Sequence, residues 1–359
     1  MIELTRRQLA RASLCMGALA GLEIAAPVFA KPTSGAISDE KLLASVNPEL
    51  REFARPMLAW RNGPPLSRNF LNIRKGAAGP APKLASDVPV ARRRVGVPGS
   101  LPAVTVYVIN AGGAKRPAIL HTHGGGFVLG DAQSEVPGKQ ALAKALDCVI
   151  VTVDYALAPE ATYRTSVEQN YAALKWLHDN ATSLGVDRKR IAVMGESAGG
   201  GHAALLAIAA RDRGEVPLVF QCLVYPMLDD RTGSVRMPRW PIGQLAWDAP
   251  ANRFGWQSFL GQAPGTARVP AAAVPARTAS LAGLPPAFIG VGSIDLFVDE
   301  DVTYAKRLVD AGVPTALHVV PGAFHGFDGV AARTFIAKQF TLAKTNALRR
   351  AFGQPAAAA

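Results

Sequence analysis

The chain contains little cysteine, few acidic residues and almost no long apolar runs, and each shortage narrows the classes of protein that it can be. It has 359 residues but only three cysteines, and none of these forms a CxxC pair or a Cys/His spacing typical of zinc sites. We therefore predict no metal site. Cys148 and Cys222 lie in apolar, strand-like runs, which predicts two buried free thiols, whereas Cys15 lies in a segment that we expect to be removed.

Acidic residues are outnumbered by basic ones. The chain has 27 Asp and Glu against 39 Lys and Arg, which gives a formal net charge of +12. Such an excess is typical of proteins that bind nucleic acid or anionic membranes. The basic residues are scattered, however, and the one tight run, Arg92-Arg93-Arg94, lacks the interleaved aromatic residues of single-strand binders. We interpret this run as a solvated surface patch and predict no nucleic-acid partner.

The one candidate apolar run lies at the N-terminus. Arg6-Arg7 precede a weakly apolar stretch that only Glu23 interrupts, and Val28-Phe29-Ala30 supplies small residues for a cleavage site. This layout is typical of a secretory signal, and the Arg pair resembles a twin-arginine signal. We predict that residues 1–30 are a cleaved signal peptide and that the protein is exported, periplasmic or secreted, with no stable membrane span after cleavage. The alternative is an amphipathic helix of the protein body.

The remaining chain divides by its patterns. Residues 31–85 combine a helical apolar stripe over 39–75, which Pro64-Pro65 interrupts, with a linker rich in Gly, Ala and Pro. We predict N-terminal cap helices and a linker there. Residues 86–350 alternate strand-like runs with helical patterns, which predicts an α/β fold with a mostly parallel central sheet flanked by helices. The predicted strands are 104–109, 117–123, 148–153, 190–194, 218–224, 287–291 and 315–320.

Residues 228–280 break this alternation, because they hold three of the five Trp, many Pro and no clear strand. We predict an insertion that forms, with the N-terminal helices, a helical cap over the sheet edge where ligands bind. Residues 351–359 are predicted to form a flexible tail.

A strand-to-helix turn carries the first chemical motif. Gly195-Glu196-Ser197-Ala198-Gly199 fits the G-x-S-x-G nucleophile elbow and joins a predicted strand to a predicted helix. The sharp turn pushes the Ser hydroxyl above the sheet, the two Gly leave room where side chains would clash, and the helix N-terminus supplies oriented N–H groups. The pattern alone recurs by chance, but this context favours Ser197 as a nucleophile.

A run of glycines ends the strand 117–123. His123-Gly124-Gly125-Gly126-Phe127 can turn unobstructed N–H groups toward a ligand, and such donors could hold the oxyanion that forms when Ser197 attacks a carbonyl. A flexible loop is the alternative. The same motif accompanies the elbow in lipases and esterases, so the two motifs together predict acyl-transfer chemistry.

A serine nucleophile needs a base, and the base needs an orienting acid. In proteins that carry this nucleophile elbow, the acid and then the histidine follow the serine along the chain. Of the later histidines, His318 lies within an apolar strand, whereas His325 lies in a loop beside glycines, so we predict His325 as the base. Asp295 is the first carboxylate after the strand 287–291 and is the predicted acid, with Asp299 as the alternative.

Together these motifs resemble those of the hormone-sensitive-lipase-like group of α/β-hydrolase esterases and lipases. The resemblance spans about residues 100–330, in the family's order. The matching segments are His123–Phe127, Asp154–Glu160, Gly195–Gly200, Tyr225-Pro226, Asp295–Glu300, Ala311–Val313 and His325–Phe327. Three positions depart from the family pattern: Glu196 replaces Asp, Ala156 replaces Arg and Leu296 replaces Pro. We interpret Glu196 as a buried hydrogen-bonding group that supports the elbow rather than as a catalytic residue.

The resemblance implies an α/β-hydrolase fold, a helical cap, no cofactor and a small-molecule ester substrate. It implies that Ser197, Asp295 and His325 form the triad and that His123 shapes the glycine loop. The N–H groups of Gly125, Gly126 and Ala198 would form the oxyanion hole. The sequence thus predicts a serine carboxylester hydrolase for short to medium acyl esters, acting through an acyl-enzyme on Ser197. The alternatives are an amidase or lactonase with the same triad, or a non-catalytic ligand-binding homologue.

Overall fold

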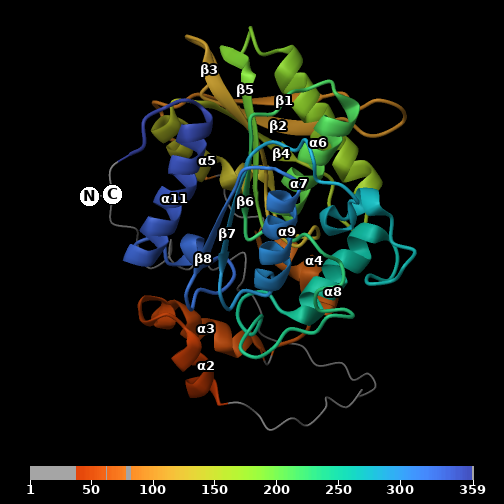
Figure 1. Cartoon of the computed structure of the whole chain (residues 1–359), viewed down its shortest axis with the longest axis vertical. Coiled ribbons are helices and arrows are strands. Elements are labelled where there is room, and N and C mark those ends of the chain that lie inside the picture. The colour runs from red at the N-terminus through yellow and green to blue at the C-terminus, as the bar shows by residue number, and fades with distance from the viewer. Residues whose placement is uncertain (1–37, 62, 78–81, 358–359) are drawn as a thin grey trace.

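The computed structural model describes residues 38–61, 63–77 and 82–357, and a twisted sheet of eight strands lies at its centre (Figure 1). The strand order is β1-β2-β4-β3-β5-β6-β7-β8. The β1–β2 and β2–β4 pairs are antiparallel and all other pairs are parallel, so the α/β class and the mostly parallel sheet are confirmed. The strands are β1 Val90–Val95, β2 Val104–Ile109, β3 Arg116–Thr122, β4 Val149–Asp154, β5 Val186–Glu196, β6 Phe220–Val224, β7 Ala287–Gly292 and β8 Thr315–Val320.

Each of the seven predicted strands is present, and β1 is the strand that the sequence did not predict. It carries Arg92-Arg93-Arg94, whose side chains are exposed, so it lacks the apolar alternation that reveals a half-buried strand. As an edge strand it pairs only with β2. Charged edge strands are common because they discourage pairing with another chain.

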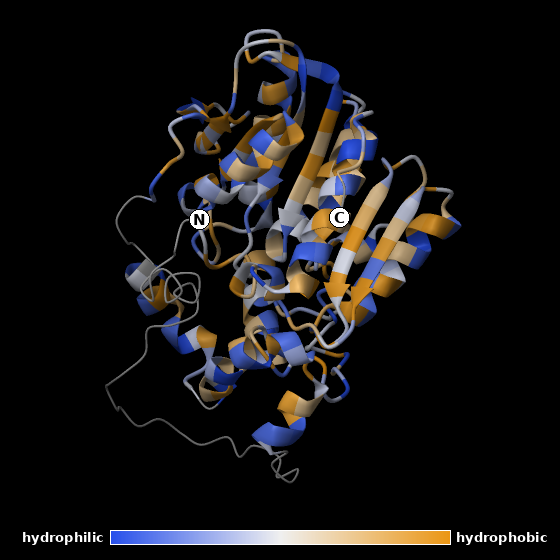
Figure 2. Cartoon of the chain, turned by 90° about the vertical axis from the view of Figure 1, so that its left-hand side faces the viewer, coloured by the Kyte–Doolittle hydropathy of each residue, from blue (hydrophilic) through white to orange (hydrophobic). Residues whose placement is uncertain are grey.

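Helices cover both faces of the sheet (Figure 1). On one face lie α5, Ala132–Leu146, and α11, Phe335–Ala351; on the other lie α6, Tyr163–Asp179, α7, Ala198–Arg213, and α9, Val298–Asp310. Strands β4, β6 and β7 are buried along nearly their whole length and are mostly apolar, as expected for a sheet covered on both faces (Figure 2). Cys148 and Cys222 are buried free thiols within this core, as predicted.

The predicted helical stripe over 39–75 is divided into separate short elements. These are α2 Asp39–Ser45, the 3-10 turn η1 Pro48–Leu50, α3 Arg51–Arg61 and α4 Leu66–Ala77. Residues 228–280 contain α8, Ala249–Leu260, and the 3-10 turns η2, Ala271–Ala273, and η3, Pro275–Arg277, with none of the sheet's strands. Helix α4 packs against α8, where the rings of Phe70 and Phe254 lie 5.1 Å apart. The two segments that we predict as a cap therefore contact each other.

The last part of the chain is held more tightly than the sequence predicts. A short helix, α10 Phe327–Val330, follows β8, and α11 ends at Ala351. Beyond it Phe352 is buried, the Gln354 amide donates to the Leu146 carbonyl, and the Ala357 N–H donates to Asn346. Residues 352–357 are thus packed against the body instead of forming a flexible tail.

Two predictions concern membranes and export. The signal peptide over residues 1–30 lies outside the described residues and stays a prediction. In the part of the chain that the structure describes, no helix has the length and apolar character needed to cross a membrane.

Candidate active site

Ser197 occupies the turn between β5 and α7 in a backbone conformation that non-glycine residues rarely adopt. Its φ is 58° and its ψ is −123°. Two hydrogen bonds hold it: its N–H donates to the Val224 carbonyl, and its carbonyl accepts from the Met227 N–H, both at 2.9 Å. Strain of this kind persists only where surrounding structure enforces it, and it often marks a functional residue.

The flanking glycines are required by close backbone approach, as the motif predicts. A Cβ atom on Gly199 would lie 2.0 Å from the Thr122 carbonyl oxygen. One on Gly195 would lie 2.2 Å from the Gly199 carbonyl oxygen. Any larger residue would push β3, β5 and the start of α7 apart and displace the Ser197 hydroxyl.

His325 and Asp295 lie in line with the Ser197 hydroxyl. His325 Nε2 is 2.9 Å from Ser197 Oγ, and its Nδ1 is 2.8 Å from Asp295 Oδ2. Asp295 is fully buried, and its other oxygen accepts the Phe297 N–H at 3.0 Å. An ionised carboxylate can only accept, so a hydrogen bond between these two groups requires a proton on Nδ1, and Nε2 is the ring nitrogen that faces the serine.

The alternative residues lie elsewhere. His318 is in β8, where its ring packs edge-on against Phe340. Asp299 lies exposed in the first turn of α9, where its backbone carbonyl accepts the Thr303 hydroxyl. In the described structure neither residue forms a hydrogen bond to Ser197 or His325, so the geometry favours Asp295 and His325 over both.

The glycine loop lies directly beside the nucleophile. A Cβ atom on Gly124 would be 3.4 Å from Ser197 Cβ. Gly125 and Gly126 have φ values of 118° and 59°, which L-residues with side chains rarely adopt. Among the described residues, no carbonyl accepts the N–H group of either glycine. The Ala198 N–H, in the first turn of α7, is one of the helix-terminal donors that have no partner within the helix.

Side chains from distant parts of the sequence fix this loop. The Tyr155 hydroxyl donates to the His123 carbonyl at 2.7 Å, and the two rings stack. Arg74 of α4 donates to the Val128 carbonyl at 2.6 Å and to the Ala158 carbonyl at 2.5 Å, and pairs with Glu160 at 2.8 Å. No sequence pattern singles out Arg74, because no motif surrounds it and its partners lie more than 50 residues away.

Beneath the elbow, Glu196 is the centre of a buried ionic cluster. Its carboxylate lies 2.7 Å from His121 Nε2 and 2.8 Å from Lys139 Nζ. Burial alone raises the pKa of Glu196, but the charges of Lys139 and His121 outweigh it and hold the pKa well below its usual value. The two contacts agree with a supporting role for Glu196 at the elbow, and its side chain, which is 18% exposed, is partly rather than fully buried.

Replacing Lys139 with Met is expected to lower the free energy of unfolding by about 3 kcal/mol, because Glu196 loses its strongest compensating charge in a buried site. Urea denaturation at pH 7.5 measures this. The matched control is Lys144→Met on the same helix, whose pair with Asp87 is exposed to solvent and is expected to contribute little to stability. Equal losses in the two variants would show that the buried pair does not support the elbow.

His202 of α7 lies behind the loop in an aromatic pocket. Its ring packs edge-on against Phe127, Tyr155 and Phe259, and neither ring nitrogen has a partner among the described residues. Burial is the main reason that the pKa of His202 falls from 6.5 to about 3. The native protein therefore holds this imidazole neutral.

This shift predicts a loss of stability in acid. Between pH 6.5 and about 3 the unfolded chain binds a proton at His202 and the native protein does not, so stability falls as pH falls through that window. A His202→Leu variant lacks this contribution. We expect its stability relative to the unmodified protein to improve steadily from pH 7 to pH 4 in urea denaturation. A difference that stays constant with pH would contradict a buried neutral His202.

The mostly parallel sheet carries a serine at a strand-to-helix turn. A histidine and an aspartate lie on later loops at the same edge. This combination defines the class of α/β hydrolases. A family model described as alpha/beta hydrolase fold matches residues 119–329. The chain belongs to this family, that of the hormone-sensitive-lipase-like esterases.

Several known proteins similar to the chain are named as esterases. The carboxylesterase NlhH of Mycobacterium tuberculosis is 36% identical over 284 residues, which cover 75% of this chain and 85% of that protein. An arylesterase of Saccharolobus solfataricus is 32% identical over 212 residues, 59% of this chain and 68% of that protein. A solved bacterial heroin esterase gives a TM-score of 0.79 at 33% identity, covering 86% of this chain and 99% of that one. Esterase LipW from Mycobacterium marinum gives 0.71 at 33% identity, with 86% and 97% covered. The chain is thus a carboxylesterase-like hydrolase.

Proposed function

We propose that the protein hydrolyses carboxylic esters through an acyl-enzyme on Ser197. The observation that carries the proposal is the continuous contact from Ser197 Oγ to His325 and from His325 to the buried Asp295. His325 takes the Ser197 proton as the oxygen attacks the ester carbonyl, and Asp295 orients the imidazole and stabilises its charged form. His325 then gives the proton to the leaving alcohol, and water attacks the acyl-enzyme with the help of the same base.

The developing oxyanion is held by backbone donors. Ala198 follows Ser197 directly, and Gly125 and Gly126 follow Gly124, the loop residue that borders Ser197; the N–H groups of these two glycines donate to no other described residue. Preorganised donors in a site shielded from water stabilise the charge without reorganising, and a single one contributes about 10²–10³-fold to kcat. The hydrogen bond from Arg74 to the Val128 carbonyl supports this role, because it fixes the backbone next to the donors.

Short to medium acyl esters are the proposed substrates, on the resemblance to the family. The test is hydrolysis of p-nitrophenyl esters from acetate to dodecanoate by a chain that starts at residue 31, beside its Ser197→Ala variant. Turnover that falls toward the long esters and disappears in the variant is the expected result. No turnover of any ester would contradict the proposal, and amide and lactone substrates would then be tried on the same pair of proteins.

A further inference from the structure

Trp247, from the 228–280 insertion, lies on the glycine loop beside Ser197. A Cβ atom on Gly126 would lie 2.1 Å from Cη2 and 2.4 Å from Cζ2 of its indole. The ring therefore occupies the space directly against Gly126, one of the proposed oxyanion donors. Trp247 as a whole is only partly buried.

Two successive hydrogen bonds fix the edge of the indole. The Trp247 Nε1–H donates to Asn252 Oδ1 at 3.1 Å, and Asn252 Nδ2 donates to the Thr232 carbonyl at 2.8 Å. Asn252 is fully buried in α8. Rotation of the indole would leave a buried amide oxygen without its donor, which is unfavourable. The ring is thus held in one orientation by residues of its own insertion.

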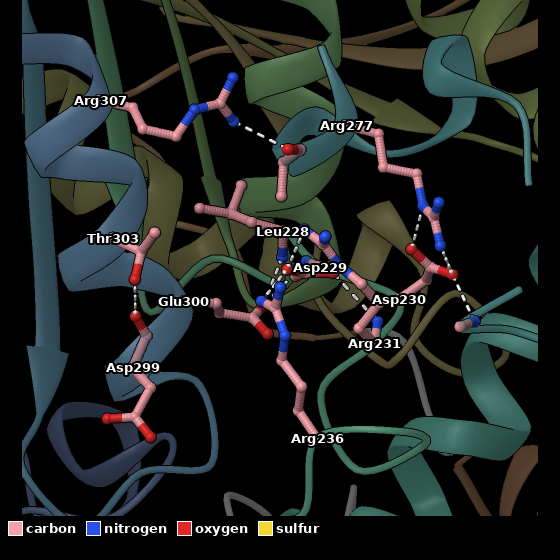
Figure 3. Close-up of polar contacts among 12 residues, drawn as sticks. Leu228, Asp229, Asp230, Arg231, Arg236, Arg277, Asp299, Glu300, Thr303 and Arg307 are labelled. Carbon is pink, nitrogen blue, oxygen red and sulfur yellow. Dashed lines mark hydrogen bonds and ion pairs between the residues drawn. The ribbon is translucent and has the colours of Figure 1, made fainter. Parts of the chain in front are cut away.

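The beginning of the insertion is anchored to α9, the helix that follows Asp295 (Figure 3). Glu300 Oε1 accepts the N–H groups of Leu228 at 2.6 Å and of Asp229 at 3.2 Å. The Asp229 carbonyl accepts the Thr232 N–H at 3.2 Å, which places the Thr232 carbonyl for Asn252. The series of hydrogen bonds that orients Trp247 therefore begins at the buried carboxyl group of Glu300 in the sheet domain.

The end of the insertion is also hydrogen-bonded to α9. Arg277 donates to both oxygens of the buried Asp230, at 2.6 and 2.9 Å, and Arg307 of α9 donates to the Ala276 carbonyl at 2.8 Å (Figure 3). The Ala276 N–H also donates to the Leu228 carbonyl at 3.1 Å. Both ends of the insertion are bonded to each other and to α9. The segment that carries Trp247 is therefore held in a fixed position.

We propose that Trp247 is a specificity-determining residue and that Asn252 is the positioning residue that holds it. The indole limits the size of the ester group that can lie beside Gly126 when the carbonyl oxygen accepts from the oxyanion donors. This inference rests on the proposed ester hydrolysis. A large rigid ring next to the reacting carbonyl excludes bulky groups, and its removal leaves room that longer or wider groups can fill.

The test measures kcat/KM of Trp247→Ala against two series of p-nitrophenyl or related esters, one with longer acyl groups and one with larger alcohols. We expect the ratio of a bulky to a small substrate to rise about tenfold or more in at least one series. Trp240→Ala is the matched control, because this Trp lies in the same insertion, is 39% exposed and has Lys41 Nζ over its ring. Its ratios are expected to stay unchanged.

Asn252→Leu keeps the Trp247 indole but removes its hydrogen-bond acceptor, so it separates the effect of the ring's orientation from the effect of its size. Alone it is expected to shift the ratios in the same direction as Trp247→Ala, and in the Trp247→Ala background it is expected to add no further shift. Trp247→Phe, which keeps a ring but loses the N–H donor, is expected to give an intermediate shift and serves if the alanine variant does not fold.

Unchanged ratios in both series, in a Trp247→Ala or Trp247→Phe protein that melts cooperatively, would overturn the inference while leaving Ser197-dependent hydrolysis intact. Loss of the proposed function gives a different result: the unmodified protein then shows no hydrolysis that depends on Ser197. The two failures are therefore distinguishable in the same experiment.

Discussion

Replacing Ser197 with alanine is expected to lower kcat for p-nitrophenyl butyrate by about 10⁵–10⁶-fold, with little change in the folded structure. The hydroxyl is the group that His325 contacts, and without it no acyl-enzyme can form. The alanine methyl group fits the same turn, so thermal unfolding should remain close to that of the unmodified protein. Steady-state kinetics with freshly purified protein measure the effect.

The control for this substitution is Ser183→Ala, since Ser183 is exposed and its hydroxyl only donates to the Asn180 carbonyl. We expect this variant to retain full activity. A Ser197→Ala protein that hydrolyses the ester at a rate comparable with the control would place the nucleophile elsewhere in the molecule.

Asp295→Asn is expected to lower kcat by about 10⁴-fold. The asparagine can still accept the Phe297 N–H through its oxygen, but its NH₂ group would then face His325 Nδ1. That contact favours the tautomer with the proton on Nε2, which cannot accept the proton of Ser197. The loss should fall on kcat more than on KM, because the residue contacts His325 and not the substrate.

Asp299→Asn tests the alternative acid in the same assay. Asp299 is exposed on α9 and forms no hydrogen bond or ion pair with His325 in the described structure, so its neutralisation should leave kcat almost unchanged. If Asp299→Asn were the inactive variant and Asp295→Asn the active one, the assignment of the acid would be reversed.

The sheet and the three candidate catalytic residues could be predicted because local patterns specify them. Apolar strand runs alternate with helices, and the carboxyl ends of parallel strands meet at one edge. Ser197, Asp295 and His325 each follow such a strand, so their proximity follows from the topology together with the chain order of the fold. His318 could be set aside for the same reason, since it lies within a strand.

Other features depend on tertiary contacts that no local pattern reveals. Arg74 reaches the glycine loop from α4, and Trp247 reaches it from an insertion without strands. Lys139 lies in the interior, where it pairs with Glu196 and Glu135. Strand β1 was missed because exposed arginines replace its apolar alternation, and the tail was misjudged because the partners of Phe352 and Gln354 lie far along the chain.

The most direct test of a serine nucleophile at position 197 is covalent labelling with diethyl p-nitrophenyl phosphate, followed by mass spectrometry of the intact protein and of its peptides. Such reagents modify serines that a neighbouring base activates. A single diethylphosphoryl group per chain is expected, located on the peptide that contains Ser197, with no label on the Ser197→Ala variant. A label on another residue, or equal labelling of the variant, would contradict a nucleophile at Ser197.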